Sequence, residues 1–413
     1  MGGVGGLLVA RPPAARRGYA CPFPPPRIEE TVGRSASIED VSFMAEALRL
    51  AGRIPARPWP NPPVGAVVVR DGRVVGRGAH LGTGTDHAEA VALREAGPLA
   101  KGATLYCTLE PCNHQGRRPA CAPMVASSGI ARLVIGVRDP NPRVAGGGLE
   151  AVRRAGVAVE SGVLASEALE LVWPFVATRA FERPFVLLKT ATSRDGFFAP
   201  LPATRAATTP HYLTGIDARR DAHRLRRWSD VVAVGEATLR QDRPRLDGRL
   251  LGPSEPCPAD DAVPACVDTD LSLDEGWPRP FWVFAGRAAA SSPRRPEVER
   301  RQGTVVPCDE REGHVDPVSL VREFARRGGH CLMLEAGPRL SRAFLDAGVV
   351  DRWIAYVAPA TLGQGETWPR GTPAWSGHVT RIERVGEDEK TVFDRMSFES
   401  ALANMGGAAG EGR

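Results

Sequence analysis

Three side chains in the first third of the sequence have the types and spacing of a metal centre. His87 is followed by Cys112 and Cys121, so the chain offers one imidazole and two thiolates. This set fills three corners of a zinc tetrahedron and leaves the fourth for water, which is typical of a catalytic rather than a structural zinc site. Bound zinc lowers the pKa of that water and makes hydroxide available near neutral pH. Glu89, two residues after His87, is then the candidate catalytic residue that carries a proton to a leaving amine.

The order of these residues favours one class of zinc enzyme. His-x-Glu followed by Pro-Cys-x-x-Cys is typical of deaminases that act on nucleobases. His-x-Glu alone is a weak signal, the cysteines could be ordinary buried thiols, and here eight residues separate them instead of two. The context supports a metal site, because an expected helix over 86–95 carries the histidine and the glutamate near its start. An expected strand over 103–108 then leads into residues 110–112 at the opening of the next helical segment.

Length and composition indicate a globular protein of two or three domains. Of the 413 residues, 43% are hydrophobic and 24% charged, and the net charge of +5 is small. We therefore expect an anionic small-molecule partner and no nucleic acid, because there is no dense basic stripe with interleaved aromatic residues. Eight cysteines are too few for a disulfide scaffold, and thiolate ligands favour the reducing cytoplasm. No run of eighteen apolar residues occurs, so we expect no membrane association.

The composition of the two ends of the chain predicts disorder. The first 28 residues contain four arginines and no acidic residue, but they are rich in glycine and proline and lack an amphipathic pattern. We interpret residues 1–38 as a disordered extension, with organelle targeting as the alternative. Residues 401–413 are expected to form a disordered tail.

The elements between these ends predict a layered domain around the metal residues. A helix is expected from Ser37 or Asp40 to Gly52, followed by strands over 64–69 and 73–78 that are joined by a turn at 71–72. After the cysteines come a helix over 124–128 and a strand over 132–136. The alternation predicts an α/β domain of three layers, α/β/α, with a mixed sheet over residues 39–182. A helix over 165–179 closes this domain.

Residues 41–182 resemble the deaminase half of the bifunctional pyrimidine deaminase/reductase family of riboflavin biosynthesis. The matching segments are 60–65, His80, 87–89, 108–112, the eight-residue cysteine spacing and 139–146. The resemblance implies a cytidine-deaminase-like fold in which His87, Cys112 and Cys121 hold Zn²⁺ and Glu89 moves the proton. It also implies that Asn61 and His80 lie near the substrate base, and that His114 and Arg117 bind the ribose phosphate. His114 as a solvated loop histidine is the alternative.

Residues 183–400 read as a second α/β domain, and their motifs resemble the reductase half of the same family. The matching segments are 189–196, 212–215, 218–219, 225–226, 235–238, 242–246 and 334–338. The resemblance implies a dihydrofolate-reductase-like fold that uses NADPH. No G-x-G-x-x-G fingerprint follows a strand, but a strand over 331–334 runs into a helix over 339–345, whose free backbone N–H groups could receive a pyrophosphate.

The resemblance assigns two sets of residues to this second site. The set implied to line NADPH is Thr192, Tyr212, Thr238, Asp242, Thr269, Gly337, Pro338 and Arg339. The set implied to face the substrate is Lys189, Arg226, Leu246, Arg249 and Glu335. Alternatives remain open, because Arg226 and Arg249 could be surface cations and residues 337–338 an ordinary turn.

Three departures from the family pattern, at four positions, occur in this half. Arg243 stands where a small acidic or amide residue is usual, so that an ion pair with Asp242 could form. Asp247 and Gly248 stand where threonine and an apolar residue are usual, and Tyr212 where tryptophan is more common.

The predicted function is a two-step enzyme, which we expect to be a homo-oligomer. The N-terminal half would deaminate 2,5-diamino-6-ribosylamino-4(3H)-pyrimidinone 5′-phosphate, and the C-terminal half would reduce the ribose of the product to a ribityl chain. One alternative is a paralogue in a pyrimidine-derived secondary-metabolite pathway, with an active deaminase and an altered or inactive reductase. The other is a nucleic-acid deaminase, which would need stacking aromatic residues, whereas aromatic residues make up only 6% of this chain.

Overall fold

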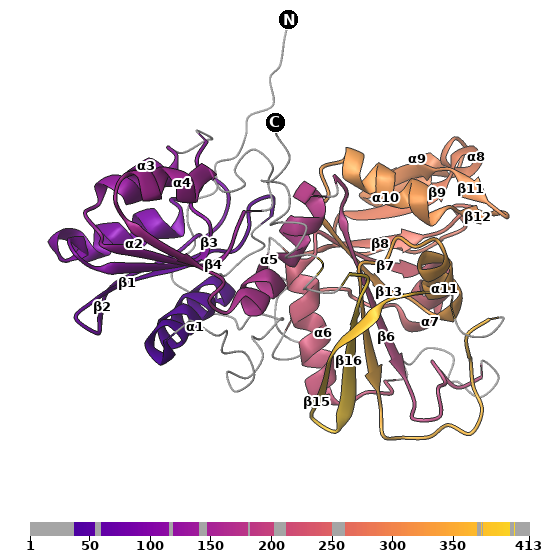
Figure 1. Cartoon of the computed structure of the whole chain (residues 1–413). Helices are drawn as coiled ribbons and strands as arrows, with labels where there is room; N and C mark the ends of the chain where they lie inside the picture. The colour runs from indigo at the N-terminus through magenta and orange to yellow at the C-terminus, as the bar shows by residue number, and fades with distance from the viewer. Residues whose placement is uncertain are drawn as a thin grey trace, which may run out of the picture.

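The computed structural model contains two large β-sheets with helices packed on them (Figure 1). It describes residues 37–53, 59–114, 119–139, 147–180, 182–201, 212–249, 261–369, 373, 375–396 and 400. Within those ranges, no helix has the length and apolar character needed to cross a membrane. The sheets take their strands from separate stretches of chain, one before and one after residue 182.

The N-terminal half is a sheet of five strands between two helical layers. Its order is β2-β1-β3-β4-β5, with β1 antiparallel to both neighbours and the last three strands parallel. Helices α2, α3 and α4 cover one face, and α1 and α5 lie on the other (Figure 1), which confirms the predicted three-layer α/β/α arrangement. The elements are α1 (Ile38–Gly52), β1 (Gly65–Arg70), β2 (Arg73–Ala79), α2 (Ala88–Ala96), the short 3₁₀ helix η2 (Gly97–Ala100), β3 (Thr104–Leu109), α3 (Cys121–Ser127), β4 (Arg132–Val137), α4 (Gly147–Arg154), β5 (Ala158–Ser161) and α5 (Ala165–Ala180).

Helix α2 lies directly on the backbone of strand β2, and this contact places the start of the helix. A Cβ atom on Gly78 would lie 2.0 Å from the carbonyl oxygen of Ala88, and one on Gly76 would lie 2.2 Å from that of Ala92. Only glycine leaves room for so close an approach. The N-terminus of α2, where the His-x-Glu pair stands, is thereby held against the sheet.

The C-terminal half is a sheet of nine strands in the order β10-β9-β8-β7-β13-β6-β14-β16-β15. The strands from β10 to β14 are parallel, and the hairpin of β15 and β16 adds an antiparallel edge. The strands are β6 (Phe185–Thr192), β7 (Val231–Gly235), β8 (Val263–Val267), β9 (Phe281–Gly286), β10 (Gly303–Cys308), β13 (Cys331–Glu335), β14 (Arg352–Val357), β15 (His378–Val385) and β16 (Asp388–Asp394), beside the small pair β11 (Glu310–Arg311) and β12 (His314–Val315). The helices are α6 (Ile216–Trp228), α7 (Glu236–Asp242), α8 (Arg287–Ala290), α9 (Arg295–Arg300), α10 (Pro317–Arg326) and α11 (Pro338–Asp346).

The predicted elements around the first site occur within a few residues of their expected bounds, with one correction. Ser37 caps α1 as expected, in a reciprocal capping box with Asp40. Residues 110–112 do not open a helix: they are irregular, and in the described part of the chain the first helix after β3 begins at Cys121. Helix α4 and strand β5 were not predicted.

The predicted ranges of the two domains, residues 39–182 and 183–400, stay predictions. The disorder expected at the two ends concerns residues 1–36 and 401–413, which lie outside the described part of the chain.

A buried ion cluster joins the two halves. Arg352 of β14 contacts Glu170 of α5 through two hydrogen bonds, Nη1–Oε1 at 2.6 Å and Nη2–Oε2 at 2.8 Å. Its Nε donates to Asp394 of β16 at 2.7 Å. Arg381 adds a contact of 3.1 Å to Glu170. Because the first three side chains are almost completely buried, helix α5 is fixed to the second sheet by charges that water does not screen.

Candidate functional site

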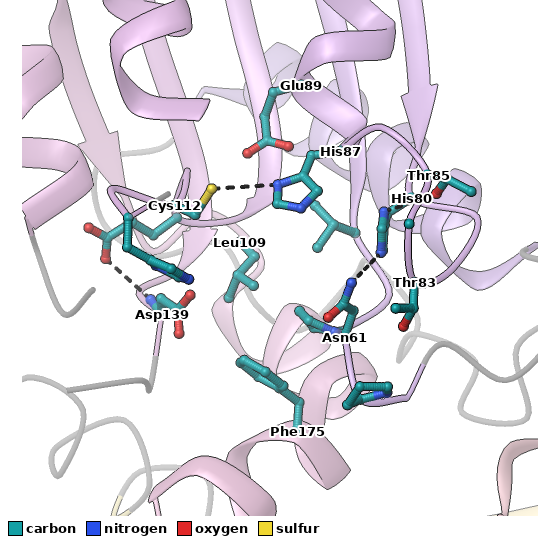
Figure 2. Close-up of a pocket in the computed structure, with 16 residues that line it drawn as sticks. Asn61, His80, Thr83, Thr85, His87, Glu89, Leu109, Cys112, Asp139 and Phe175 are labelled. Atoms are coloured by element: carbon teal, nitrogen blue, oxygen red, sulfur yellow. Dashed lines mark hydrogen bonds between the residues drawn. The ribbon is translucent and has the colours of Figure 1, made fainter. Parts of the chain in front are cut away.

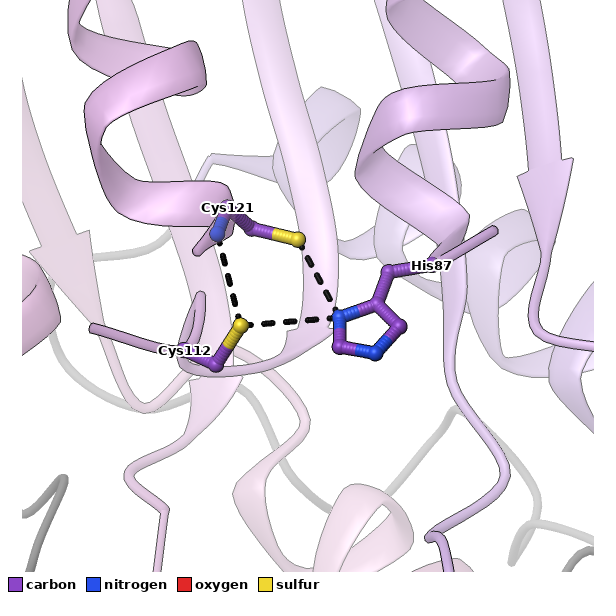
Figure 3. A group of neighbouring side chains, drawn as sticks. All are labelled: His87, Cys112 and Cys121. Atoms are coloured by element: carbon purple, nitrogen blue, oxygen red, sulfur yellow. Dashed lines mark hydrogen bonds between the residues drawn. The ribbon is translucent and has the colours of Figure 1, made fainter. Parts of the chain in front are cut away.

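The three predicted metal ligands come together from three different elements (Figure 3). His87 is the N-cap residue of α2, Cys112 lies in the loop after β3, and Cys121 is the first residue of α3. Their ligand atoms lie within 4.8 Å of one another. The His87 Nδ1 atom is 3.1 Å from the Cys121 sulfur and 3.5 Å from the Cys112 sulfur.

The pKa values of the two thiols shift in opposite directions. Hydrogen bonds from Cys121 and His87 lower the pKa of the Cys112 thiol, whereas the hydrogen bond to Cys112 and burial raise the pKa of the Cys121 thiol. The backbone N–H of Cys121, at the start of α3, also donates to the Cys112 sulfur at 3.3 Å. One imidazole nitrogen and two sulfurs at these separations fit tetrahedral zinc with one position left open.

Glu89, the second residue of α2, lies next to this cluster (Figure 2) and is only 4% exposed. Burial raises the pKa of its carboxyl group to about 7. A carboxyl group with that pKa both accepts and releases a proton near neutrality, as a general acid–base residue must.

The cluster forms one wall of a cavity of about 330 Å³ (Figure 2). Asn61, His80 and His114, three of the four residues expected to contact substrate, line it. The fourth, Arg117, lies outside the described residues. The remaining lining residues, which sequence reasoning had not assigned to the site, are Pro60, Pro62, Val64, Thr83, Gly84, Thr85, Leu109, Glu110, Asp139 and Phe175.

On the wall of the cavity opposite the cysteines, hydrogen bonds fix which groups of His80 and Asn61 donate and which accept. His80 Nδ1 is 3.2 Å from the carbonyl oxygen of Asp86, which can only accept, so the hydrogen of the neutral ring is on Nδ1. His80 Nε2 therefore accepts from the Asn61 Nδ2 amide group, 3.0 Å away. The Asn61 oxygen points away from His80 and stays available as an acceptor (Figure 2). Burial lowers the pKa of His80, which keeps this ring neutral.

Glu110 holds the floor of the cavity together. Its Oε1 accepts from the backbone N–H groups of Gly148 at 3.0 Å and Leu149 at 3.2 Å, at the start of α4. Its Oε2 accepts from the backbone N–H of Asp139 at 3.2 Å. One buried carboxylate thus joins the end of β3, the end of β4 and the start of α4, two residues before the metal ligand Cys112.

A second group of predicted residues lies along the carboxyl edge of the parallel strands in the other half. Thr192 ends β6, Glu335 ends β13, and Thr269 follows β8 by two residues. Thr238, in the first turn of α7, lies beside Gly337, where a Cβ atom would be 4.0 Å from the threonine oxygen. Gly337, Pro338 and Arg339 form the start of α11. Ligands of open α/β sheets bind at this edge, so the geometry is compatible with the predicted cofactor site.

The two other predicted cofactor residues do not end or directly follow these strands. Asp242 is the last residue of α7, at the opposite end of the helix from Thr238's turn. Tyr212 is 60% exposed, and the Arg219 guanidinium lies over its ring at 4.5 Å. The side chain of Leu246 packs in the hydrophobic core, and its role toward substrate stays a prediction.

Three of the other predicted substrate residues form a buried charged group. Arg226 of α6 donates to both oxygens of Glu335, from Nε at 2.5 Å and from Nη2 at 2.9 Å. Lys189 pairs in register with Glu335 across β6 and β13. Burial opposes ionisation of Glu335, but Arg226 and Lys189 lower the pKa of its carboxyl group to about 2. Burial lowers the pKa of Lys189.

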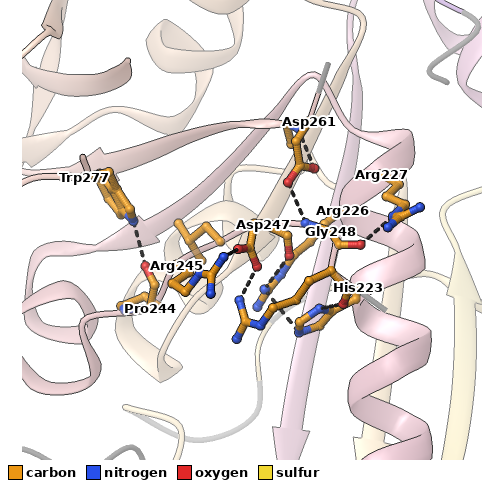
Figure 4. Close-up of polar contacts among 12 residues, drawn as sticks. His223, Arg226, Arg227, Pro244, Arg245, Asp247, Gly248, Asp261 and Trp277 are labelled. Carbon is orange, nitrogen blue, oxygen red and sulfur yellow. Dashed lines mark hydrogen bonds and ion pairs between the residues drawn. The ribbon is translucent and has the colours of Figure 1, made fainter. Parts of the chain in front are cut away.

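The sequence departures at 247 and 248 form a connected polar cluster (Figure 4). The Asp247 carboxylate, in a residue only 1% exposed, accepts from Arg245 at 2.6 Å and from Arg249. The Asp247 backbone oxygen accepts from Arg226 Nη1 at 3.0 Å. A carboxylate at this position therefore fixes two arginines that water partly reaches.

Gly248 fits this cluster because it has no side chain (Figure 4). A Cβ atom there would lie 2.4 Å from the Arg227 side chain, and the Gly248 N–H donates to Asp261 at 2.7 Å. Arg243, which we had considered as a partner of Asp242, donates to Glu275 at 2.5 Å on the surface.

Two family models match the two halves. The model described as "Cytidine and deoxycytidylate deaminase zinc-binding region" matches residues 37–137. The model described as "RibD C-terminal domain" matches residues 184–390. All three candidate metal ligands lie within the first match, and the Arg226–Glu335 pair lies within the second.

Relatives with both halves cover most of the chain. The chain is 37% identical over 336 residues to riboflavin biosynthesis protein RibD of Escherichia coli, covering 79% of this chain and 89% of that protein. It is 37% identical over 363 residues to RibD of Bacillus amyloliquefaciens, covering 84% and 94%. The structure of Acinetobacter baumannii RibD superposes with a TM-score of 0.72 at 29% identity, covering 87% of this chain and 99% of the other.

A Thermotoga maritima structure described as a diaminohydroxyphosphoribosylaminopyrimidine deaminase/5-amino-6-(5-phosphoribosylamino)uracil reductase superposes with a TM-score of 0.70. Its identity is 28%, and the match covers 86% of this chain and 98% of the other. The alternative of a secondary-metabolite paralogue gains no support from these proteins. Since the relatives match through both halves and nearly over their whole length, the chain belongs to the RibD family.

Proposed function

We propose that this chain catalyses two successive steps of riboflavin biosynthesis, a zinc-dependent hydrolytic deamination and an NADPH-dependent reduction. The first substrate is the diaminohydroxyphosphoribosylaminopyrimidine named for the Thermotoga protein. One observation carries the proposal: His87, Cys112 and Cys121 meet at a cavity that also contains Glu89.

The residues of the first site have distinct proposed roles. Zinc, when bound by His87, Cys112 and Cys121, lowers the pKa of a water molecule so that hydroxide is available for attack on the amine-bearing carbon. Glu89 accepts the proton of the water and returns it to the amine, which leaves as ammonia. The Asn61 oxygen accepts a hydrogen bond from a donor group of the pyrimidine. His114, at the mouth of the cavity, and Arg117 contact the phosphate.

The residues of the second site position two ligands for hydride transfer. NADPH, when bound, would supply a hydride to the ribose C1′, and a proton from solvent would complete the opening of the sugar ring to a ribityl chain. We assign the cofactor to the edge formed by Thr192, Thr238, Thr269 and the start of α11. Lys189, Arg226 and Arg249 face the substrate, and Glu335 orients the Arg226 guanidinium.

The test measures ammonia release and NADPH consumption separately, with the same purified protein and the same pyrimidine substrate. We expect ammonia release without NADPH, and NADPH oxidation only after deamination has occurred. Removal of zinc by a chelator should abolish ammonia release, and should leave NADPH oxidation intact when the deaminated product is supplied. A protein that releases ammonia but never oxidises NADPH with either compound would contradict the second half of the proposal.

Assembly and location belong to the same proposal. Strand β15 forms the edge of the nine-stranded sheet and exposes Val379 (54%) and Ile382 (64%), and an edge of this kind favours pairing with a second copy. We therefore propose a homo-oligomer, to be checked by light scattering of the protein and of Ile382→Lys. Cys112 and Cys121 form no disulfide, as zinc ligands must not, and zinc thiolates favour the reducing cytoplasm, where we place the protein. We propose no nucleic-acid partner, which a filter-binding assay with RNA and single-stranded DNA would test.

A further inference from the structure

One hydrogen bond connects the loop of the first cavity with a helix of the other half. The indole Nε1 of Trp59 donates to the backbone oxygen of Trp228 at 2.7 Å, in a buried environment. The two rings meet edge to face, with centroids 5.9 Å apart and an interplanar angle of 71°. Both residues are only 8% exposed. The contact therefore joins positions 169 residues apart in the chain through a dry interface.

The Trp228 end of this contact is rigid. Trp228 is the last residue of α6, and the final carbonyl groups of a helix have no partner within the helix. The Trp59 indole satisfies one of these carbonyls from another part of the chain. Two residues earlier, Arg226 fixes the same end of α6 to Glu335 through two hydrogen bonds. The indole is thus attached to a helix end that the second site itself holds in place.

The Trp59 end leads directly into the first cavity. Asn61, two residues on, lines the cavity and donates its amide N–H to His80. Pro60 and Pro62 on either side also line it and restrict the backbone between them. The position of Asn61 is consequently set from two sides, by His80 within the N-terminal half and by Trp59 against α6.

From this we infer that Trp59 is a positioning residue, which uses helix α6 of the reductase half to hold Asn61 in place for the deaminase substrate. The inference deepens the proposed function and rests on it. Binding of the pyrimidine in the first cavity then depends on a residue of the other half, Trp228, that touches neither the metal ligands nor the substrate. The reductase half is accordingly a structural part of the deaminase site.

The experiment measures KM and kcat for ammonia release in full-length variants. Trp228→Ala keeps the backbone carbonyl that accepts from the Trp59 indole and removes the ring that packs against that indole. Because a hydrogen bond from Asn61 to a bound ligand is worth up to about tenfold in affinity, we expect KM to rise by up to about tenfold with little change in kcat. Trp228→Phe keeps an aromatic ring against Trp59 and should retain the wild-type KM. Trp59→Phe removes the indole N–H but keeps an aromatic ring, and should raise KM by a smaller factor. Zinc content should be unchanged in all three variants.

The decisive comparison uses Asn61→Ala. If Trp59 and Trp228 act through Asn61, adding Trp228→Ala to Asn61→Ala should raise KM no further. Arg381→Ala is the matched control, because it removes another contact between the halves at a distance from Asn61, and its KM should equal that of the wild type.

Two results would overturn the inference. One is a wild-type KM in both Trp228→Ala and Trp59→Phe. The other is that Trp228→Ala raises KM by the same factor in the wild type and in Asn61→Ala. If Trp228→Ala fails to fold and loses zinc, Trp59→Phe alone tests the inference. A raised KM supports it, and an unchanged KM overturns it. Failure of the proposed function is distinguishable, because the wild-type protein would then release no ammonia.

Discussion

Glu89 shows how the environment of one side chain decides its chemistry. Burial raises the pKa of this carboxyl group to about 7, so both protonation states are accessible where the enzyme works. Glu89→Gln keeps the shape and removes the exchangeable proton. Because general acid–base catalysis contributes about 10²–10⁴-fold to rate, we expect ammonia release to fall by that factor while zinc content stays unchanged. Ammonia release near the wild-type rate, in a variant that retains zinc, would exclude Glu89 as the proton carrier.

Asp247 is the departure from the family pattern with the clearest structural consequence. Its buried carboxylate lies between the guanidinium groups of Arg245 and Arg249. Asp247→Asn removes the charge that holds these two cations together, and we expect KM for the reductase substrate to rise about tenfold, since charge-assisted hydrogen bonds are the stronger class. NADPH oxidation gives this KM, and ammonia release should not change.

Arg243 supplies the matched comparison for Asp247. It pairs with Glu275 in a contact whose side chains are 64% and 45% exposed, and such pairs contribute little. Arg243→Ala should therefore leave both activities and the thermal midpoint close to wild type. A loss of reductase activity in Arg243→Ala as large as that in Asp247→Asn would assign the effect to overall charge rather than to the buried carboxylate.

Helix α4 depends on a residue that is not part of it. Glu110 accepts from two backbone N–H groups at the start of α4 and from Asp139 after β4. In Glu110→Gln an amide N–H₂ must face one of these donors, and we expect a loss of about 1–3 kcal/mol in unfolding free energy. Because Glu110 also supports the segment that carries Cys112, zinc affinity should fall about 10-fold or more. Competition with a chromogenic chelator measures it, and an unchanged zinc affinity would show that Cys112 is positioned independently of this carboxylate.

The end of helix α6 makes the protein sensitive to acid. Burial and then the neighbouring Arg226 lower the pKa of His223 to about 4, well below its value of 6.5 in an unfolded chain. Between these values the unfolded chain binds the proton and the folded protein does not, so stability falls as the pH drops from 6.5 toward 4, by about 1.4 kcal/mol for each unit of the gap. Above pH 6.5 this contribution is constant. His223→Gln should flatten the dependence of the thermal midpoint on pH in this range, and an unchanged slope would exclude His223 as the cause.

Individual elements could be predicted from the sequence where residues close together in the chain determine them. The turn at 71–72, the capping residue Ser37 and the alternation of strands and helices are set by neighbouring residues. The metal ligands followed from their types and order along the chain. Helix α4 was missed because the groups that satisfy its first N–H groups belong to Glu110, which is distant in sequence.

Contacts between distant elements did not follow from the sequence. Phe175 reaches the cavity from α5, and only the packing of that helix decides which of its apolar residues does so. The same holds for Asp261, which receives the Gly248 N–H, and for Trp228, which receives the Trp59 indole. Leu246 has a left-handed backbone (φ 52°) and packs in the core, which its place in a motif did not indicate.

At the scale of the whole molecule, one of the two hydrophobic clusters of the described residues spans both halves. A single cluster of buried residues extends from Val41 in α1 through α5 to Val392 in β16. Trp59 and Trp228 belong to it and form part of the boundary between the sheets. A continuous core of this kind predicts that the halves unfold together rather than as independent units.

The buried ion cluster is the sharpest test of that coupling. Burial opposes ionisation of Glu170, but Arg352 and Arg381 lower the pKa of its carboxyl group, so it is charged inside the interface. Glu170→Gln leaves Arg352 with one carboxylate in place of two, and removing one partner of a buried pair costs about 3–5 kcal/mol. We expect a lower thermal midpoint and, in contrast to the wild type, release of zinc and loss of NADPH oxidation at separate temperatures. Glu150→Gln, which breaks the exposed pair with Arg154 in α4, is the control and should leave the midpoint unchanged. If Glu170→Gln still unfolds in one step at the wild-type temperature, the shared hydrophobic core alone couples the halves, and the ions contribute nothing to it.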